Sequence, residues 1–179
     1  AVTVLNGRGE VGDAVIASVD KREARLEVRK VRRVPAVRTE LVLAIGALKS
    51  SAWDEVLTHA VELGVSRVVR IQTDHAVSEP GGGRRDAKAG RWRERMIQAC
   101  KQSANPWLPA LDWVDSVEAA LARMPEGARH LLGDLEGGTP LRRIEAPASG
   151  AVVVWVGPEG DFSPEERAAV RAIPGAVPV

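Results

Sequence analysis

The spacing of hydrophobic positions changes along the chain and predicts two kinds of structure. Within residues 1–37, short apolar runs alternate with charged positions, which is typical of strands with one exposed face. The turn signal Asn6-Gly7-Arg8-Gly9 separates the first two runs. We expect three strands there, at 2–5, 11–19 and 24–29. Three strands do not close a barrel, so this part is either a remnant of a larger β-domain or is completed by something outside the chain.

From about residue 40, apolar runs alternate with helical patterns. Period-3.6 spacing predicts helices at 52–63, 85–104 and 116–123, and apolar runs predict strands at 41–45, 65–71, 130–134 and 151–156. Ser51 is the expected N-cap of the first helix, and Gly64 ends it. This order is typical of an α/β fold with a parallel sheet and helices on both faces. Pro35 marks a linker, so we expect two domains, 1–37 and 38–179.

One stretch joins a strand directly to a helix through a glycine-containing loop. Residues 152–156 are apolar without polar alternation, which predicts a strand covered on both faces. Ser163 fits an N-cap, Pro164 the first helical position, and Glu166 completes a capping box. The loop 157–162 therefore leaves the carboxyl end of a buried strand, where open α/β sheets bind ligands. A plain strand-to-helix turn is the alternative.

Two of the predicted strands end in glycine-rich loops, at Gly133 and at Gly157 and Gly160. Glycine lets backbone groups approach a ligand without obstruction by a side chain. The phosphate-binding patterns G-x-x-x-x-G-K-[ST] and G-x-G-x-x-G are both absent from the sequence. These loops therefore suit a neutral or cationic ligand better than a triphosphate.

Composition and charge narrow the possible partners and the compartment. The net charge of +1 does not indicate a nucleic-acid partner, but basic residues gather at 21–38 and 84–95 and predict a phosphate-binding patch, with solvated faces as the alternative. One cysteine excludes an intrachain disulfide, and with three histidines it excludes a Cys/His zinc site. No apolar run reaches the ~20 residues of a membrane helix, and no signal peptide is recognisable. We expect a cytoplasmic protein without a bound metal.

The stretch W-V-G-P-E-G-D-F-S-P-E-E at 155–166 resembles the G-P-E-G-G-F-S-P-E-E signature of the 16S rRNA uridine N3-methyltransferases, the RsmE family of the SPOUT superfamily. E-L-G-V at 62–65, residues 43–49 and Gln102-Ser103 match further family segments in the same order. The resemblance spans nearly the whole chain.

This resemblance implies a SPOUT-type parallel sheet with a C-terminal trefoil knot, preceded by a partial PUA-like β-domain. The chain stops at Val179, before the family's L-G-x-x-I-L-R segment, so we expect the knot segment to be truncated. The family uses S-adenosylmethionine, acts as a homodimer and methylates small-subunit rRNA at uridine N3.

The resemblance also implies functional positions. The cofactor is expected at Leu132, Gly133, Val156, Gly157, Pro158, Glu159 and Gly160. RNA is expected at Arg8, Arg32, Arg33, Arg84, Arg85, Lys101 and Gln102, where cations hold phosphates. Methylation at N3 requires removal of an imide proton, and His75 and Glu159 are the candidate catalytic residues. The alternative for Glu159 is a carboxylate that caps backbone N–H groups in its loop.

Four positions depart from the family pattern. His59 replaces a lysine, His75 an arginine, Lys101 a glutamate and Asp161 a glycine. Two alternatives therefore stay open: a non-catalytic RNA-binding homologue, and a SPOUT enzyme with a different RNA acceptor.

Overall fold

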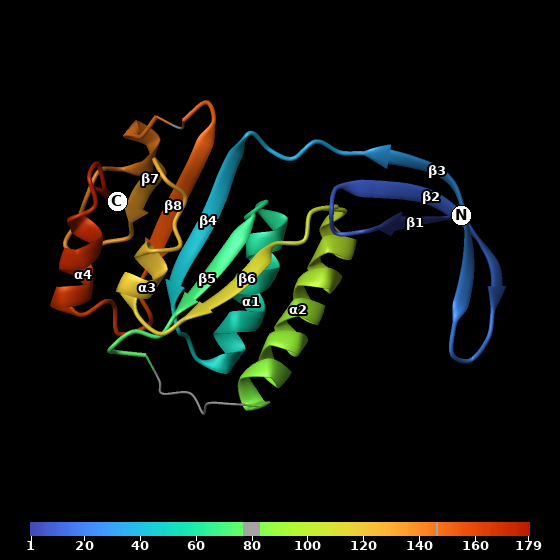
Figure 1. Cartoon of the computed structure of the whole chain (residues 1–179), viewed down its shortest axis with the longest axis horizontal. Coiled ribbons are helices and arrows are strands. Elements are labelled where there is room, and N and C mark those ends of the chain that lie inside the picture. Colours follow the sequence, from blue (N-terminus) through green and yellow to red (C-terminus); the bar gives the residue numbers. More distant parts are fainter. Residues whose placement is uncertain (77–82, 146) are drawn as a thin grey trace.

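The computed structural model describes residues 1–76, 83–145 and 147–179, which form two separate sheets (Figure 1). A three-stranded antiparallel sheet contains β1 (Val2–Leu5), β2 (Glu10–Val19) and β3 (Ala24–Arg33). A six-stranded parallel sheet has the order β6-β5-β4-β8-β7-β9. Its strands are β4 (Thr39–Gly46), β5 (Arg67–Ile71), β6 (Ala110–Val114), β7 (Arg129–Leu132), β8 (Gly150–Val156) and β9 (Val177–Pro178).

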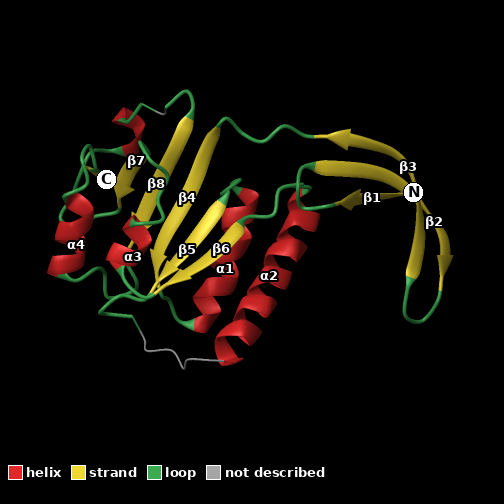
Figure 2. Ribbon diagram, viewed as in Figure 1, coloured by secondary structure: helices red, strands yellow, loops and turns green. Residues whose placement is uncertain are grey.

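Helices cover both faces of the six-stranded sheet, as the sequence predicts (Figure 2). On one face, α1 (Ser50–Glu62) and α2 (Gly83–Ser103) enclose a core with Trp53, Leu57 and Trp92. On the other face, α3 (Val117–Leu121) and α4 (Pro164–Arg171) enclose a second core with Trp155 and Phe162. A short 3₁₀ helix, Leu141–Arg143, precedes β8. Among the described helices, we find none whose length and apolar character would let it cross a membrane.

The prediction that residues 152–156 are covered on both faces is wrong. Ala151, Val153 and Trp155 are buried, but Val152 and Val154 are only half-buried and Val156 is 36% exposed. The open face of β8 continues into an apolar groove of about 450 Å³ beside α1. A run of apolar residues therefore does not show that both faces of a strand are covered by helices, since such residues also line a surface groove.

The predicted N-cap of α1 is also wrong. The helix begins at Ser50, two residues earlier than predicted, and its N-cap is Lys49, which has no capping side-chain hydrogen bond. The carboxylate of Glu159 instead accepts a hydrogen bond from the Lys49 backbone N–H at 3.3 Å. A residue 110 positions away therefore binds the N-cap residue, but no side chain caps the N–H groups inside the first turn of the helix. The predicted end of the helix at Gly64 is confirmed, since Gly64 follows the C-cap Leu63 with a φ of +78°.

The β1–β3 sheet differs from the expected half-exposed strands. Every residue of β3 is exposed. The pairing of Ile16 with Leu26 and of Ala14 with Val28 gathers apolar side chains on one face, and Ile16, Leu26, Val28 and Val31 are all exposed there. The alternating pattern correctly indicates an amphipathic sheet, but no second layer of the described residues covers its apolar face.

The two sheets meet at the turn after β1. A Cβ on Gly9 would lie 2.2 Å from the indole of Trp107, so only glycine lets this turn contact the ring. The backbone N–H of Gly9 donates to Pro106 at 2.9 Å, and Leu108 donates to Gly7 at 3.0 Å. The predicted boundary at residue 37 falls between β3 and β4 and stays a prediction.

Candidate functional site

The loops that follow β7 and β8 lie side by side at the carboxyl edge of the parallel sheet. The two strands pair in parallel, with Leu132 opposite Trp155, and the Gly133 N–H donates to the Trp155 carbonyl at 2.9 Å. Both of the glycine-rich loops predicted from the sequence therefore leave the same edge of the sheet. Such an edge is where open α/β sheets bind ligands.

The three predicted cofactor glycines differ in what surrounds them. A Cβ on Gly133 would meet only the Trp155 carbonyl, at 3.4 Å, so the space beside Gly133 is open. A Cβ on Gly157 would lie 2.6 Å from Oδ1 of Asp161, and one on Gly160 would lie 3.1 Å from the His75 Cβ. Gly157 and Gly160 therefore permit close packing of the loops themselves, whereas Gly133 leaves room for a ligand.

The other predicted cofactor residues lie along the same edge. Leu132 is buried, and its carbonyl accepts a hydrogen bond from the Val179 N–H at 2.8 Å. Pro158 lies so close to the end of β4 that a Cβ on Gly46 would approach its Cδ to 2.5 Å. Together with Val156 at the end of β8, these residues form one continuous edge. Their contact with a cofactor stays a prediction.

Glu159 is fully engaged by backbone groups. Its exposed carboxylate accepts hydrogen bonds from its own backbone N–H and from that of Lys49, and these hold the pKa of Glu159 below its ordinary value. The charge also lies at the N-terminus of α1, where the helix dipole favours an anion. This arrangement favours the capping alternative over a role as a base, because both hydrogen bonds stabilise the ionised form.

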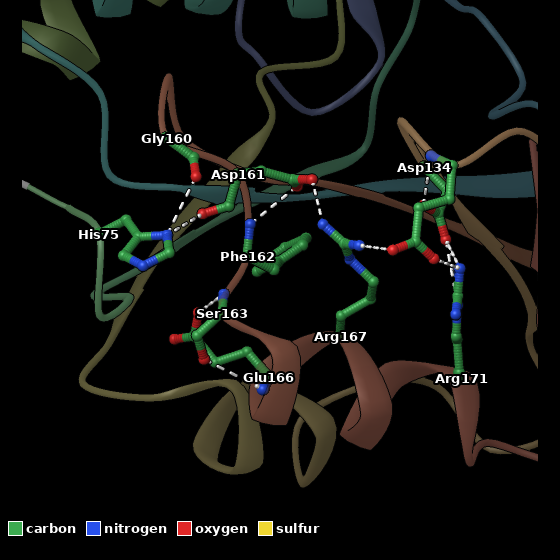
Figure 3. A network of polar contacts seen from close by, with 10 residues as sticks. His75, Asp134, Gly160, Asp161, Phe162, Ser163, Glu166, Arg167 and Arg171 are labelled. Atoms are coloured by element: carbon green, nitrogen blue, oxygen red, sulfur yellow. Dashed lines mark hydrogen bonds and ion pairs between the residues drawn. The ribbon is translucent and has the colours of Figure 1, made fainter.

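His75 follows β5 and lies against the β8 loop (Figure 3). Its Nδ1 lies 3.0 Å from the Gly160 carbonyl oxygen and 3.1 Å from that of Asp161. Carbonyl oxygens only accept hydrogen bonds, so Nδ1 must carry a proton. In the neutral ring the lone pair is then on Nε2, which faces away from both carbonyls (Figure 3).

The predicted capping box of α4 is confirmed and has an additional partner. Ser163 accepts from the Glu166 N–H, and Glu166 Oε2 accepts from the Ser163 N–H at 2.9 Å. The second oxygen of Glu166 accepts from the Asp74 N–H at 3.0 Å. The start of α4 therefore also fixes the loop that carries His75, although the sequence pattern predicts only the local contact.

Sequence reasoning missed a group of ion pairs between the β7 loop and α4. Arg167 contacts Asp161 at 2.5 Å and Glu136 at 3.0 Å. Arg171 contacts Glu136 at 3.0 Å and also pairs with Asp134. We call these five residues the charge ladder. In the sequence, Arg167 and Arg171 are four residues apart and resemble the solvated face of a helix. The one unusual signal is Asp161, which stands where the family signature has a glycine.

The predicted RNA-binding residues fall into two groups. Near the junction of the two sheets, five are exposed: Arg8, Arg32, Arg33, Lys101 and Gln102. At the other end of α2, Arg85 lies 3.5 Å from Asp115 and over the Trp113 ring, and the side chain of Arg84 lies outside the described residues. Arg85 and Lys101 are about 24 Å apart along the helix axis, at 1.5 Å per residue. RNA binding by either group stays a prediction.

The chain is an α/β protein with two glycine-containing loops at the edge where its parallel strands end, the edge at which open α/β sheets bind ligands. A family model described as an RNA methyltransferase domain matches residues 35–179. The chain belongs to this family of RNA methyltransferases.

Individual relatives agree with the family. The chain is 29% identical over 178 residues to the ribosomal RNA small subunit methyltransferase E of Mycobacterium bovis, covering 97% of this chain and 68% of that protein. The structure of a ribosomal RNA small subunit methyltransferase E from Neisseria gonorrhoeae bound to S-adenosyl methionine matches with a TM-score of 0.89. It is 26% identical, over 99% of this chain and 73% of that one. A probable rRNA-methyltransferase from Porphyromonas gingivalis matches with a TM-score of 0.82 at 28% identity, over 99% and 74%.

Proposed function

We propose that this protein transfers a methyl group from S-adenosylmethionine to small-subunit rRNA, at N3 of a uridine. The observation that carries the proposal is the shared edge of β7 and β8, where Gly133 and Gly157 lie on neighbouring loops. The related Neisseria gonorrhoeae structure, named as bound to S-adenosyl methionine, supports the choice of cofactor. The Mycobacterium bovis relative, named as acting on the small ribosomal subunit, supports the choice of substrate.

The residues at the edge fit this cofactor. The open space beside Gly133 lets the backbone approach a flat ring or a methionine chain, since no side chain fills it. Val156 supplies exposed apolar surface along the same edge, and the buried Leu132 and Pro158 pack beneath it. S-adenosylmethionine supplies an electrophilic methyl group on a sulfonium, so the acceptor nitrogen must be made nucleophilic by the protein.

For that step we assign His75 as the base. The Nδ1 proton is held by the carbonyls of Gly160 and Asp161, which leaves Nε2 of the neutral ring to accept a proton from the uridine imide. These two carbonyls belong to the β8 loop, which is also part of the proposed cofactor site. The β8 loop would therefore position both the base and the cofactor. Glu159 is the weaker candidate, because its carboxylate already accepts two backbone hydrogen bonds.

The exposed cations near the junction of the sheets would hold rRNA phosphates. The β1–β3 sheet belongs to this proposal as a PUA-like domain over residues 1–37, and residues 38–179 as a SPOUT methyltransferase domain of the trefoil-knot class. A homodimer and a cytoplasmic location complete the proposal. Sedimentation equilibrium tests the dimer, with twice the chain mass of 19.1 kDa as the expected result.

The decisive experiment is a methyl-transfer assay with labelled S-adenosylmethionine. The substrate is small-subunit RNA, free and in assembled subunits, from cells that lack the modification. Mass spectrometry of the digested RNA should locate the label on one 3-methyluridine. Retention of RNA without methyl transfer would favour a non-catalytic RNA-binding homologue, and a label on a different nucleotide would favour another acceptor.

A further inference from the structure

The charge ladder connects two loops that are separate in the sequence, the loop after β7 and the loop after β8. Its members alternate in sign in the order Asp161, Arg167, Glu136, Arg171 and Asp134 (Figure 3). Asp134 and Glu136 belong to the loop after β7, and Asp161 to the loop after β8. Both arginines lie on α4, one turn apart, so a single helix face holds the two loops together.

Asp161 occupies a position that suits glycine better. The φ of Asp161 is +62°, in the left-handed region of backbone conformation that residues other than glycine rarely adopt. Its carboxylate makes two contacts there: Oδ1 accepts from the Phe162 N–H at 2.7 Å, and Oδ2 binds Arg167. Its carbonyl accepts from His75. The unfavourable backbone conformation is thus combined with three contacts, of which the two to the carboxylate would be lost with glycine.

Three of the five members of the ladder are shielded from solvent. The side chains of Arg167 and Asp161 are 18% and 16% exposed, and that of Asp134 is covered. Burial alone would raise the pKa of Asp134, but hydrogen bonds from the Glu136 N–H and Arg171 hold it below its ordinary value. The Arg167–Asp161 pair is shielded on both sides and is therefore screened by salt less than exposed pairs are, whereas Arg171 and Glu136 are 40% and 63% exposed.

We propose that the charge ladder is a positioning device that fixes the β7 loop against the β8 loop and thereby sets the affinity for the methyl donor. Asp161 and Arg167 are its central positioning residues, because their contact reaches the β8 loop directly. The inference rests on the proposed function of this edge as the cofactor site. It adds to that function residues that need not touch the cofactor themselves.

The test compares variants by calorimetric titration with S-adenosylmethionine and by hydrogen exchange of residues 133–139 without ligand. Arg167→Gln should weaken binding about tenfold, the order expected for loss of a charge-assisted hydrogen bond, and should speed exchange in the loop. Arg167→Lys should restore part of both effects. Asp161→Gly keeps a residue suited to positive φ and should weaken binding similarly, and combining it with Arg167→Gln should add little.

Arg91→Gln is the matched control, since Arg91 is exposed on α2, on the opposite face of the sheet. Its binding and exchange should equal those of the unaltered protein. If Arg167→Gln fails to fold, Asp161→Gly alone decides the matter. Unchanged affinity and unchanged exchange in folded Asp161→Gly would overturn the inference. If the unaltered protein binds no S-adenosylmethionine, the proposed function fails, and faster loop exchange in the variants still supports the ladder as the link between the loops.

Discussion

Single residues at the edge of the sheet show how contacts decide the role of a side chain. His75 and His130 are both near β-strand ends, but His75 is exposed and donates from Nδ1, whereas His130 is buried and accepts at Nδ1 from the Trp155 indole at 2.9 Å. The hydrogen-bond partners therefore define opposite tautomers. His75 suits proton transfer with an incoming substrate, and His130 belongs to the core.

Replacement of His75 by glutamine tests its assignment as the base. Glutamine cannot remove the imide proton, so kcat for methyl transfer should fall about hundredfold, in the range typical of a lost general base. The dissociation constant for S-adenosylmethionine should stay the same. His59→Gln is the control, since the His59 side chain is exposed on α1 and pairs with Glu62 of the same helix. Equal kcat values for the two variants would remove His75 from the mechanism.

His130 predicts how stability depends on pH. Burial lowers its pKa below the ordinary value near 6.5, so the unfolded chain binds a proton that the folded protein does not. Stability from this residue is complete above pH 6.5 and is lost as the pH falls below it, by at most about 1.4 kcal/mol per pH unit.

Urea denaturation at pH 7.5 and 5.5 checks this effect. His130→Asn keeps an acceptor for Trp155 but does not titrate, so its free energy of unfolding should change less between the two pH values than that of the unaltered protein. Gly90→Ala, which changes no titrating group, should show the same pH dependence as the unaltered protein. Identical pH dependence in His130→Asn and the unaltered protein would contradict the role given to this residue.

At the scale of elements, each loop at the carboxyl edge is fixed by a neighbour from elsewhere in the chain. Glu159 of the β8 loop binds the start of α1, and Glu166 of α4 binds the loop after β5. The end of β4 approaches the β8 loop so closely that a Cβ on Gly46 would lie 2.5 Å from Pro158. The edge is thus held by tertiary contacts, and small changes in packing should be transmitted to it.

Two glycine-to-alanine substitutions test the packing of the β8 loop: one at Gly46, where the loop is in close contact, and one at Gly90, where there is free space. Gly46→Ala should destabilise the protein by about 1–3 kcal/mol, because the new methyl group overpacks against Pro158. Gly90→Ala lies in α2 with no atom within 4 Å of the new Cβ, and should stabilise the helix by about 0.5–1 kcal/mol. Thermal and urea denaturation measure both. A Gly46→Ala variant as stable as Gly90→Ala would show that the loop is not packed as described.

At the scale of the whole molecule, the periodicity of the sequence predicts the two-sided α/β layers, but it misses the strands β6 and β9. Alternation and helical spacing are set by local geometry, so they survive in the sequence. The coverage of β3 and β8 was wrongly predicted, because a strand's own residues do not say which layer lies against it. Residues 65 and 66 were likewise predicted in a strand that begins at Arg67.

The site was predictable only in part for the same reason. The glycine-rich loops and the adjacency of their strands follow from pattern and topology. The Glu159–Lys49 contact and the charge ladder join residues distant in sequence, which no local pattern specifies. The two groups of cations are a further result of the fold, since α2 separates Arg85 from Lys101 by its length.

The central claim is that the neighbouring exits of β7 and β8 bind the methyl donor, and calorimetric titration with S-adenosylmethionine tests it most directly. The unaltered protein should bind one molecule per chain. Gly133→Val should abolish binding without unfolding, because the branched side chain occupies the open space beside β7 and Gly133 does not need a positive φ. Gly90→Ala should bind normally. Equal affinity in Gly133→Val and the unaltered protein, or no binding by either, would contradict the account.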